Sequence, residues 1–362
     1  MLKFKCQNCD KTFSISSLNY KCSCGGLFTL TGKQSGILNT ALSLGEVETP
    51  VLQRDLAGQP VYLKLDYLMP TGSFKDRGAV VMIDQLAKNG VKEIVEDSSG
   101  NAGAAVAAYA AAANINCRIF LPADTSEGKI KQMRAYGAEI VKVPGDRDAT
   151  SRAVLEAAQD TYYASHVYNP LFFAGTASLA YELKKNPGIP DKIYVPVGNG
   201  TMLLGLYQGF KEIGKMPQLM AVQTEVCSPI YNSYYEKSFN QEKNSSFQDK
   251  RLRYTRDQTR DRSLKEKSGD DSAVTTMAEG IAVGSPMRKD EIIEAVEKSS
   301  GKVITVSETE IKKAYFNLHK MGIYIEPTAA AAPAGFIKDA SAGNTKLNEK
   351  VVVPLTGSGL KK

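Results

Sequence analysis

The sequence has no tryptophan and only two histidines, His166 and His319. Two imidazoles are too few for a three-histidine metal centre, so that class of catalytic site is excluded. The longest run of small and apolar residues, residues 102–113, is mostly Ala and Gly. It is much shorter than the roughly 20 apolar residues that cross a bilayer. Residues 1–9 are polar and lack the apolar core of a signal peptide. We therefore expect a cytoplasmic protein that crosses no membrane.

Neither sign of charge dominates the 362 residues. Lys and Arg together number 45 and Asp and Glu 39, which gives a net charge of +6. A nucleic-acid-binding protein usually carries a clustered basic surplus, so a nucleic-acid partner is not expected. The hydrophobic fraction of 43% is ordinary for a folded protein, and the length predicts two or three packing units.

Four of the six cysteines gather near the start of the chain: Cys6, Cys9, Cys22 and Cys24. Two tight pairs of thiols can supply the tetrahedral four-sulfur shell of a structural zinc ion. A segment this short buries too little core to fold unaided, so the metal would supply the missing stability. Two disulfides or four unrelated thiols stay open, because only one residue separates the second pair. We predict a zinc-ribbon-like segment over residues 1–32, in a reducing compartment.

After residue 33 the pattern alternates strands and helices, which predicts an α/β protein with open, mainly parallel sheets covered by helices on both faces. Apolar runs predict strands at 61–65, 93–95, 117–121, 139–143, 192–197, 219–223, 302–306 and 350–355. Helices are expected at 78–89, 103–114, 127–136, 151–161, 176–185 and 202–213. Ser307 and Glu310 predict a capping box at the start of another helix.

One stretch, residues 232–272, interrupts this alternation. It holds ten basic and eight acidic residues and few aliphatic ones. Such a composition predicts a solvated loop or an irregular charged insertion. A functional lid or a partner site is the alternative.

Three turns rich in small polar residues follow predicted strands: residues 97–101, 198–201 and 356–359. Ligands of open α/β sheets bind beyond the carboxyl ends of the strands, so these turns are expected to converge. Residues 198–201 precede a helix, whose free N–H groups suit a phosphate dianion, and residues 98–101 offer the same to a carboxylate. A fourth segment, 71–78, places Lys75 just ahead of a helix.

Lys75 is the obvious nucleophile among these segments. A partly desolvated amine near a helix start can have a lowered pKa and form a Schiff base. A lone lysine is usually a solvated charge, and a lone glycine-rich turn is weak evidence. Together, a phosphate cradle, a carboxylate cradle and an amine are what a pyridoxal phosphate enzyme acting on an amino acid requires.

Five segments carry a resemblance to a known family: residues 71–79 (TGSFKDRGA), 98–101 (SSGN), 196–200 (PVGNG), 325–330 (IEPTAA) and 355–361 (LTGSGLK). In this order they resemble the threonine synthase branch of the fold-type II pyridoxal phosphate enzymes, over about residues 43–361. The resemblance implies two open sheets, with a large phosphate-binding domain of residues 33–60 and 165–362. It also implies a smaller domain, residues 61–164, that carries Lys75 and the SSGN loop.

The resemblance assigns roles residue by residue. Lys75 would hold pyridoxal phosphate as a Schiff base and then shuttle the α-proton of the substrate. The cofactor would also be bound by Asn101, by Gly198, Asn199, Gly200 and Thr201 at its phosphate, and by Thr356 or Ser358 at its pyridine nitrogen. The amino-acid substrate would be bound by Ser98, Ser99, Asn101 and Asn169. Glu326 would lie at a helix start or contact the site.

The sequence departs from the family where a substrate phosphate would bind. Phe172 stands where an Arg is expected, and Ala177-Ser178 stands where a Lys-Thr pair is expected. An apolar ring cannot replace a bidentate guanidinium at a phosphate. The resemblance implies a lyase that converts O-phosphohomoserine and water to threonine and phosphate, in a chain for which a homodimer is left open. The alternatives are a serine/threonine dehydratase or β-replacement synthase, and a non-catalytic pyridoxal phosphate-binding regulator.

Overall fold

The larger lobe is built on a six-stranded sheet with the order β12-β11-β10-β13-β5-β4. The computed structural model describes residues 2–145, 147–245 and 276–361. Neighbouring strands run parallel, except that β4 and β5 form an antiparallel hairpin. The strands are β4 (Val51–Leu56), β5 (Gln59–Lys64), β10 (Lys192–Pro196), β11 (Gln218–Thr224), β12 (Lys302–Val306) and β13 (Val351–Pro354).

Helices cover both faces of this sheet, because successive residues of a strand point to opposite sides. In β10, Tyr194 lies in one hydrophobic cluster with α10 and α11, whereas Ile193 and Val195 lie in another with α6, α7 and α9. The helices are α6 (Ser178–Lys185), α7 (Thr201–Ile213), α8 (Pro229–Ser245), α9 (Lys289–Lys298), α10 (Glu308–Lys320) and α11 (Ala331–Ser341).

The smaller lobe holds a four-stranded parallel sheet with the order β8-β7-β6-β9. Its strands are β6 (Glu93–Glu96), β7 (Asn116–Pro122), β8 (Glu139–Val143) and β9 (Tyr162–Tyr163). Its helices are α1 (Lys75–Lys88), α2 (Asn101–Ala112), α3 (Glu127–Ala135) and α4 (Arg147–Ala157). Ile94 and Ile119 pack with α1 and α2, and Val95 and Phe120 pack with Val154 of α4 on the other face. The predicted α/β class with two helix-covered sheets is thus confirmed.

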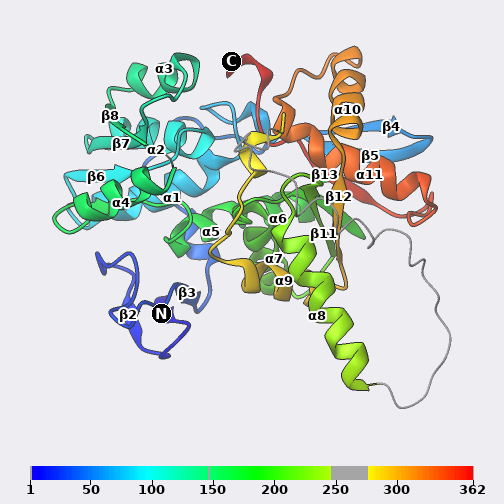
Figure 1. The fold of residues 1–362 in the computed structure, drawn as a ribbon, viewed down its shortest axis with the longest axis horizontal. Coiled ribbons are helices and arrows are strands. Elements are labelled where there is room, and N and C mark those ends of the chain that lie inside the picture. Colours follow the sequence, from blue (N-terminus) through cyan, green and yellow to red (C-terminus); the bar gives the residue numbers. More distant parts are fainter. Residues whose placement is uncertain (1, 146, 246–275, 362) are drawn as a thin grey trace, which may run out of the picture.

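The N-terminal segment is a separate antiparallel sheet of three short strands in the order β2-β1-β3. They are β1 (Lys3–Cys6), β2 (Thr12–Ser14) and β3 (Phe28–Thr31). The rings of Phe4 and Phe28 are stacked with their centroids 5.6 Å apart, and both are buried. We call residues 2–32 the ribbon. It lies below the smaller lobe in Figure 1.

The chain crosses between the lobes through α1 and returns through α5 (Pro170–Thr176). Figure 1 shows both helices between the two sheets. Their contact depends on glycines: a Cβ on Gly175 would lie 2.0 Å from the carbonyl oxygen of Arg77, and one on Gly78 would lie 2.3 Å from the ring of Phe172. The boundary predicted between residues 60 and 61 falls inside β5, a strand of the larger sheet, so the smaller lobe begins after Lys64.

The predicted charged insertion over residues 232–272 needs correction. Residues 232–245 are helical and belong to α8, and the rest of the stretch, 246–272, lies outside the described residues. Several elements were not predicted, namely β4, β9, α5, α9 and α11. The capping box of Ser307 and Glu310 is present at the start of α10.

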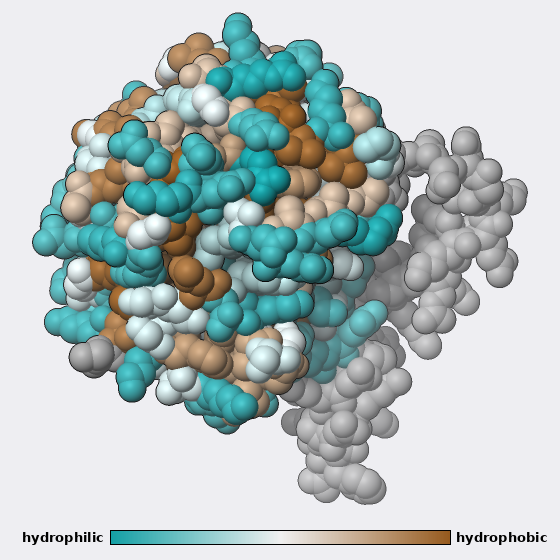
Figure 2. All heavy atoms as spheres, turned by 90° about the vertical axis from the view of Figure 1, so that its left-hand side faces the viewer, coloured by the Kyte–Doolittle hydropathy of each residue, from teal (hydrophilic) through white to brown (hydrophobic). Residues whose placement is uncertain are grey.

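Among the described residues, no helix combines the length and apolarity that crossing a bilayer requires. Figure 2 shows the face made by the smaller lobe and the ribbon, where hydrophobic residues form small groups between hydrophilic ones. On this face hydrophilic side chains therefore break up the exposed apolar surface.

Candidate active site

A cavity of about 860 Å³ lies between the two lobes, at the carboxyl ends of their strands. Nine of the residues predicted to bind cofactor or substrate line it: Lys75, Ser98, Ser99, Asn101, Gly198, Asn199, Gly200, Thr201 and Thr356. The predicted turns thus converge on one space, as the geometry of open α/β sheets requires. Segment 277–285, drawn in yellow between the lobes in Figure 1, completes the wall.

Lys75 is the first residue of α1, and the large sheet holds the start of this helix in place. Phe74 donates its backbone N–H to the carbonyl of Thr356 at 3.0 Å. The Lys75 Nζ donates to Thr201 Oγ1 at 2.9 Å and lies 4.7 Å from the centroid of the Phe74 ring. Burial lowers the pKa of Lys75 to about 8, although the carboxylates of Glu96 and Glu326 act in the opposite direction. A larger neutral fraction at physiological pH makes this amine a better nucleophile.

The turn opposite Lys75 has the shape of an anion site. Gly200 precedes α7 with a φ of +73°, and no side chain caps this helix start. The N–H groups of the first turn therefore remain available to an anion, with the positive end of the helix dipole behind them. A Cβ on Gly198 would lie 3.0 Å from the backbone of Ile281, so a side chain there would press on the far wall. The turn fits a phosphate, as predicted.

Asn101 and Glu326 join the two lobes across the cavity. The amide nitrogen of Asn101 donates to both carboxylate oxygens of Glu326, at 2.8 and 3.1 Å. Glu326 in turn lies against Gly357, where a Cβ would come within 2.2 Å of its Oε1. Glu326 therefore contacts the site, which is one of the two roles foreseen for it.

Of the two hydroxyls predicted at the pyridine nitrogen, Thr356 is the one that lines the cavity. Ser358 is buried outside the cavity lining, and its hydroxyl accepts the backbone N–H of Leu360 at 3.2 Å. In the structure Ser358 contributes to the C-terminal turn, and Thr356 is the better placed of the two hydroxyls.

Asn169, which was predicted to bind substrate, lies away from the cavity lining. Its Oδ1 caps α5 by accepting the N–H of Leu171 at 2.9 Å, and its Nδ2 donates to the Tyr162 hydroxyl at 2.9 Å. Asn169 does not line the cavity, and neither do Phe172 and Ala177. Phe172 is fully buried beneath Lys75, with its ring centroid 5.8 Å from Nζ. The positions at which phosphate ligands were expected therefore lie in the core.

Sequence reasoning missed an acidic and aromatic wall at the end of β6. Glu96 is fully buried, and its Oε1 lies 3.0 Å from the Nδ1 of His166. Asp97 accepts a hydrogen bond from the Tyr163 hydroxyl at 2.8 Å. Tyr163, His166 and Asp97 all line the cavity. Adjacent acids directly after a buried strand were the signal that could have revealed this wall.

The four ribbon cysteines bring their sulfur atoms together. All four Sγ atoms lie within 4.8 Å of one another, and three of the Sγ–Sγ pairs are separated by 3.5–3.7 Å. Four thiolates at about 2.3 Å from a tetrahedral zinc ion lie about 3.8 Å apart. A Cβ on Gly26 would meet the Cys6 sulfur at 2.6 Å, so the second turn needs this glycine. The donor set and its spacing fit zinc.

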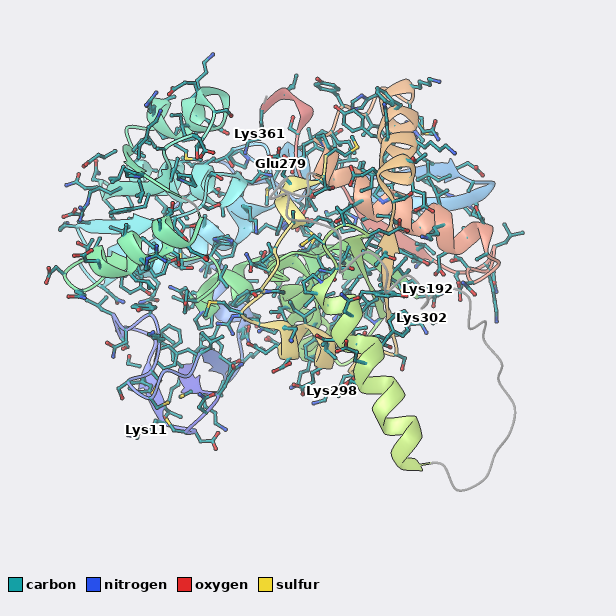
Figure 3. The ribbon with its side chains drawn as sticks, viewed as in Figure 1. Lys11, Lys192, Glu279, Lys298, Lys302 and Lys361 are labelled. Carbon is teal, nitrogen blue, oxygen red and sulfur yellow. The ribbon has the colours of Figure 1, made fainter. Side chains whose placement is uncertain are left out.

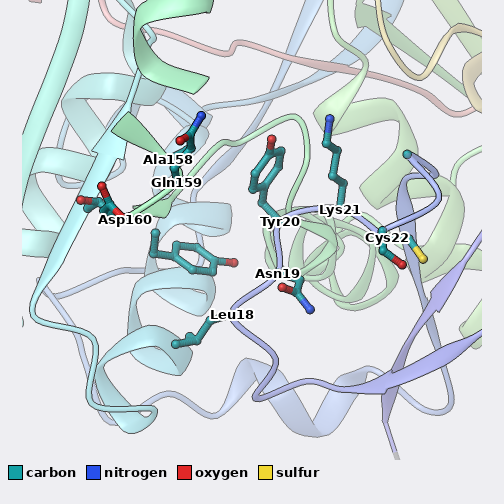
Figure 4. Close-up of a pocket in the computed structure, with 12 residues that line it drawn as sticks. Leu18, Asn19, Tyr20, Lys21, Cys22, Ala158, Gln159 and Asp160 are labelled. Atoms are coloured by element: carbon teal, nitrogen blue, oxygen red, sulfur yellow. The ribbon is translucent and has the colours of Figure 1, made fainter. Parts of the chain in front are cut away.

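The ribbon also touches the wall of the cavity. Tyr20 packs edge-on against Tyr163 and Tyr168, with centroids 5.4 and 5.3 Å apart. The buried guanidinium of Arg288 donates to the carbonyls of Phe28 in the ribbon and of Tyr168, at 3.1 and 2.9 Å. Figure 4 shows a second pocket at this junction, about 530 Å³ in volume, between residues 18–25 and 158–162.

Comparison with known sequences gives one consistent result. The family model described as pyridoxal-phosphate dependent enzyme matches residues 42–357. The chain is 32% identical to the threonine synthase of Bacillus sp. (strain ULM1), over 88% of this chain and 85% of that protein. It is 28% identical to the threonine synthase of Methanocaldococcus jannaschii, over 99% of this chain and 92% of that protein. The second match therefore takes in the ribbon.

Known structures share the fold. Serine racemase from Dictyostelium discoideum superposes with a TM-score of 0.67 at 25% identity, over 87% of this chain and 93% of that one. The processed form of threonine deaminase isoform 2 from Solanum lycopersicum gives a TM-score of 0.72 at 22% identity, over 89% and 82%.

With the lysine, the glycine turn and the family match in hand, the chain belongs to the pyridoxal-phosphate dependent enzyme family. Within it, the chain has the fold-type II architecture and is similar to threonine synthases. The predictions of an enzyme, of its cofactor class and of a threonine synthase-like relationship are thereby confirmed.

Proposed function

We propose that this protein is a carbon–oxygen lyase of the threonine synthase type, which converts O-phosphohomoserine and water to threonine and phosphate. The observation that carries the proposal is Lys75, a half-buried amine that faces an uncapped helix start in a chain with threonine synthase relatives. The family match extends over residues 42–357 and so includes every described cavity-lining residue except Lys361.

The position of each residue in the cavity gives its proposed role. Pyridoxal phosphate, when bound, supplies an electron sink that weakens the bonds at the α-carbon of an amino acid. Residues 198–201 would hold its phosphate, and Lys75 would hold its aldehyde carbon and carry the α-proton of the substrate. Ser98, Ser99 and Asn101 bind the substrate carboxylate. The Thr356 hydroxyl at the pyridine nitrogen, unlike a carboxylate, does not enforce ring protonation, which favours elimination over transamination.

A second candidate is a dehydratase or β-replacement enzyme that acts on an uncharged amino acid such as serine or threonine. Phe172 and Ala177 favour this candidate, because neither supplies a cation to the cavity. The lining also holds four carboxylates among the described residues: Asp97, Asp148, Glu279 and Glu326. These acids oppose a dianionic substrate unless a cation offsets them.

Steady-state assays separate the two candidates. The protein is supplied with O-phosphohomoserine, threonine and serine, and phosphate release and keto-acid formation are followed. Phosphate release with threonine formation supports the synthase. Keto-acid formation from threonine, with no phosphate released from phosphohomoserine, contradicts it and supports the dehydratase.

The first prediction concerns Lys75 itself. Lys75→Ala removes the amine that lies beside Thr201 at the glycine turn, so we expect loss of the visible absorbance of bound cofactor and a fall in kcat of at least about 1000-fold. Lys302→Met, at an exposed lysine at the start of β12, serves as the control. An unchanged spectrum in the Lys75 variant would remove this residue from its proposed role.

We further propose that the ribbon binds one structural zinc ion through Cys6, Cys9, Cys22 and Cys24. Four sulfur ligands leave no open coordination position, so the ion stabilises the ribbon and takes no part in the reaction. The six cysteines are unpaired, which is consistent with a reducing cytoplasmic location. A homodimer remains a prediction, which light scattering on the purified protein tests.

A further inference from the structure

Lys361, close to the C-terminal end of the chain, has a side chain whose amine lies in an unusual environment. It lines the cavity, and its Nζ is buried without a hydrogen-bond partner in the described structure. Burial lowers the pKa of Lys361, whereas the carboxylates of Glu326 and Asp76 raise it. An ammonium group can donate three hydrogen bonds, and leaving them unmade in a buried place is costly.

The position of Lys361 is set by close contacts to the loop that leads to Lys75. A Cβ on Gly72 would lie 3.1 Å from the Cδ of Lys361, so the lysine stem runs directly over this glycine. Gly72 has a φ of +82°, and its carbonyl accepts the N–H of Ser358 at 2.9 Å. Figure 3 places Lys361 between the lobes near Glu279, and both residues line the cavity. The amine is thus held at the rim of the reaction site.

The charged residues that line the cavity indicate a function for the Lys361 amine. Among the described lining residues, Lys75 and Lys361 are the only lysines or arginines. Lys75 would be occupied by the cofactor, so Lys361 is the described lining lysine whose amine would stay free to face the lining carboxylates. The positions at which the family resemblance placed phosphate-binding cations are occupied by Phe172 and Ala177, both in the core.

We infer that Lys361 binds the anionic group at the far end of the substrate side chain and so makes the enzyme selective for a phosphorylated amino acid. The inference rests on the proposed function and names the residue that gives its substrate class. A phosphate oxygen at Nζ supplies the missing hydrogen-bond acceptor, and the Lys361 ammonium offsets the negative charge of the lining carboxylate of Glu326. Lys361 is here a specificity-determining residue, and it transfers no proton.

The test measures binding to the cofactor-loaded enzyme with ligands that cannot react further. Calorimetry compares 2-amino-5-phosphonopentanoate, which keeps the anionic end, with norvaline, which lacks it. For the unchanged protein we expect the phosphonate to bind at least 10-fold more tightly than norvaline. In Lys361→Met this preference should fall to within about twofold, while norvaline binding and the cofactor absorbance stay the same.

Two further variants complete the test. Lys361→Arg keeps the charge and should retain most of the preference for the phosphonate, which shows that charge and not volume is responsible. Lys302→Met removes an exposed lysine and should change nothing. A thermal unfolding curve for each variant shows that the fold is intact.

The outcomes separate this inference from the proposed function. If the unchanged protein shows no preference for the phosphonate, or if Lys361→Met keeps the preference, the role of Lys361 is wrong. If the preference exists and depends on Lys361, but O-phosphohomoserine releases no phosphate, the proposed reaction fails while the inference stands.

Discussion

Two opposing influences set the pKa of Lys75. Burial next to Phe74 favours the neutral amine, whereas the carboxylates of Glu96 and Glu326 favour the ammonium. The net result is a pKa of about 8, below the ordinary value for a lysine. A nucleophile with a pKa close to the working pH is well suited to repeated attachment and proton transfer.

This balance predicts the pH dependence of cofactor uptake by the cofactor-free protein. The neutral amine attacks the aldehyde, so the rate should rise about tenfold per pH unit below a pKa of about 8 and level off above it. Glu326→Gln removes a carboxylate that raises this pKa, so the midpoint should move to lower pH. Stopped-flow absorbance measures both profiles.

The exposed carboxylate of Glu294 offers the matched control. Glu294→Gln should leave the midpoint of cofactor uptake where it is in the unchanged protein. An identical profile in Glu326→Gln would show that Glu326 does not act on Lys75.

At the scale of single residues, the sequence was sufficient to predict residues whose type itself indicates a function. It was not sufficient for residues whose role depends on what they pack against in the fold. Lys75 and the glycine turn were predicted because their residue types carry a function wherever the fold brings them together. Asn169 was predicted to bind substrate, but an Asn before a Pro is equally the cap of a buried helix, and in the structure it caps α5. The buried Glu96–His166 pair went unnoticed since the two residues are distant in the sequence.

At the scale of elements, helices α1 and α5 pack so closely that there is almost no space for a side chain between them at Gly175. Gly175 lies so close to the Arg77 carbonyl that a Cβ would approach it to 2.0 Å, and the opposing atom is backbone. The two helices thus meet nearly backbone to backbone, directly behind the lysine that starts α1. Such close approaches explain why small residues are required in this seam.

The seam predicts the effect of Gly175→Ala. Alanine normally favours a helix over glycine by about 1 kcal/mol, but the clash should reverse the sign and lower the free energy of unfolding by about 1–3 kcal/mol. Gly128→Ala in α3 is the matched control, because nothing lies within 4 Å of its Cβ position. Urea unfolding of both variants checks this, and equal or greater stability of Gly175→Ala would contradict it.

The elements that sequence reasoning missed share a physical cause. Helix α5 is buried over its whole length, so it has no polar face and no periodic pattern. Strand β4 lies at the sheet edge, where only one of its six residues is fully buried, and it lacks the apolar run that marked the other strands. By contrast, β7 and β10 were recognised because buried parallel strands are continuous apolar runs.

At the scale of the molecule, the ribbon is attached to the catalytic part through a few specific contacts. Arg288 links the carbonyls of Phe28 and Tyr168, and Tyr20 packs on two tyrosines of the cavity wall. The ribbon's own core is small, with Phe4 and Phe28 as its main buried rings. We therefore expect its order to depend on the proposed zinc ion and on this docking.

This dependence predicts the result of removing the metal. The unchanged protein should contain about one zinc ion per chain, and Cys22→Ser combined with Cys24→Ser should lose it. Hydrogen exchange in β1–β3 should then become fast, while the six-stranded sheet stays protected, because the ribbon unfolds locally. Cys227→Ser, outside the cluster, should keep the metal. A metal-free protein with a protected ribbon would contradict the zinc proposal.

The site is divided between two bodies. The amine of Lys75 and the glycine turn are anchored to the six-stranded sheet, through Thr356 and through the end of β10, whereas Ser98 and Ser99 follow β6 of the other sheet. A substrate whose carboxylate lies on one body and whose amino group is held on the other acts as a clamp across the gap. Its binding energy then opposes any separation of the lobes, so occupancy by an amino acid should itself make the enzyme more resistant to proteases.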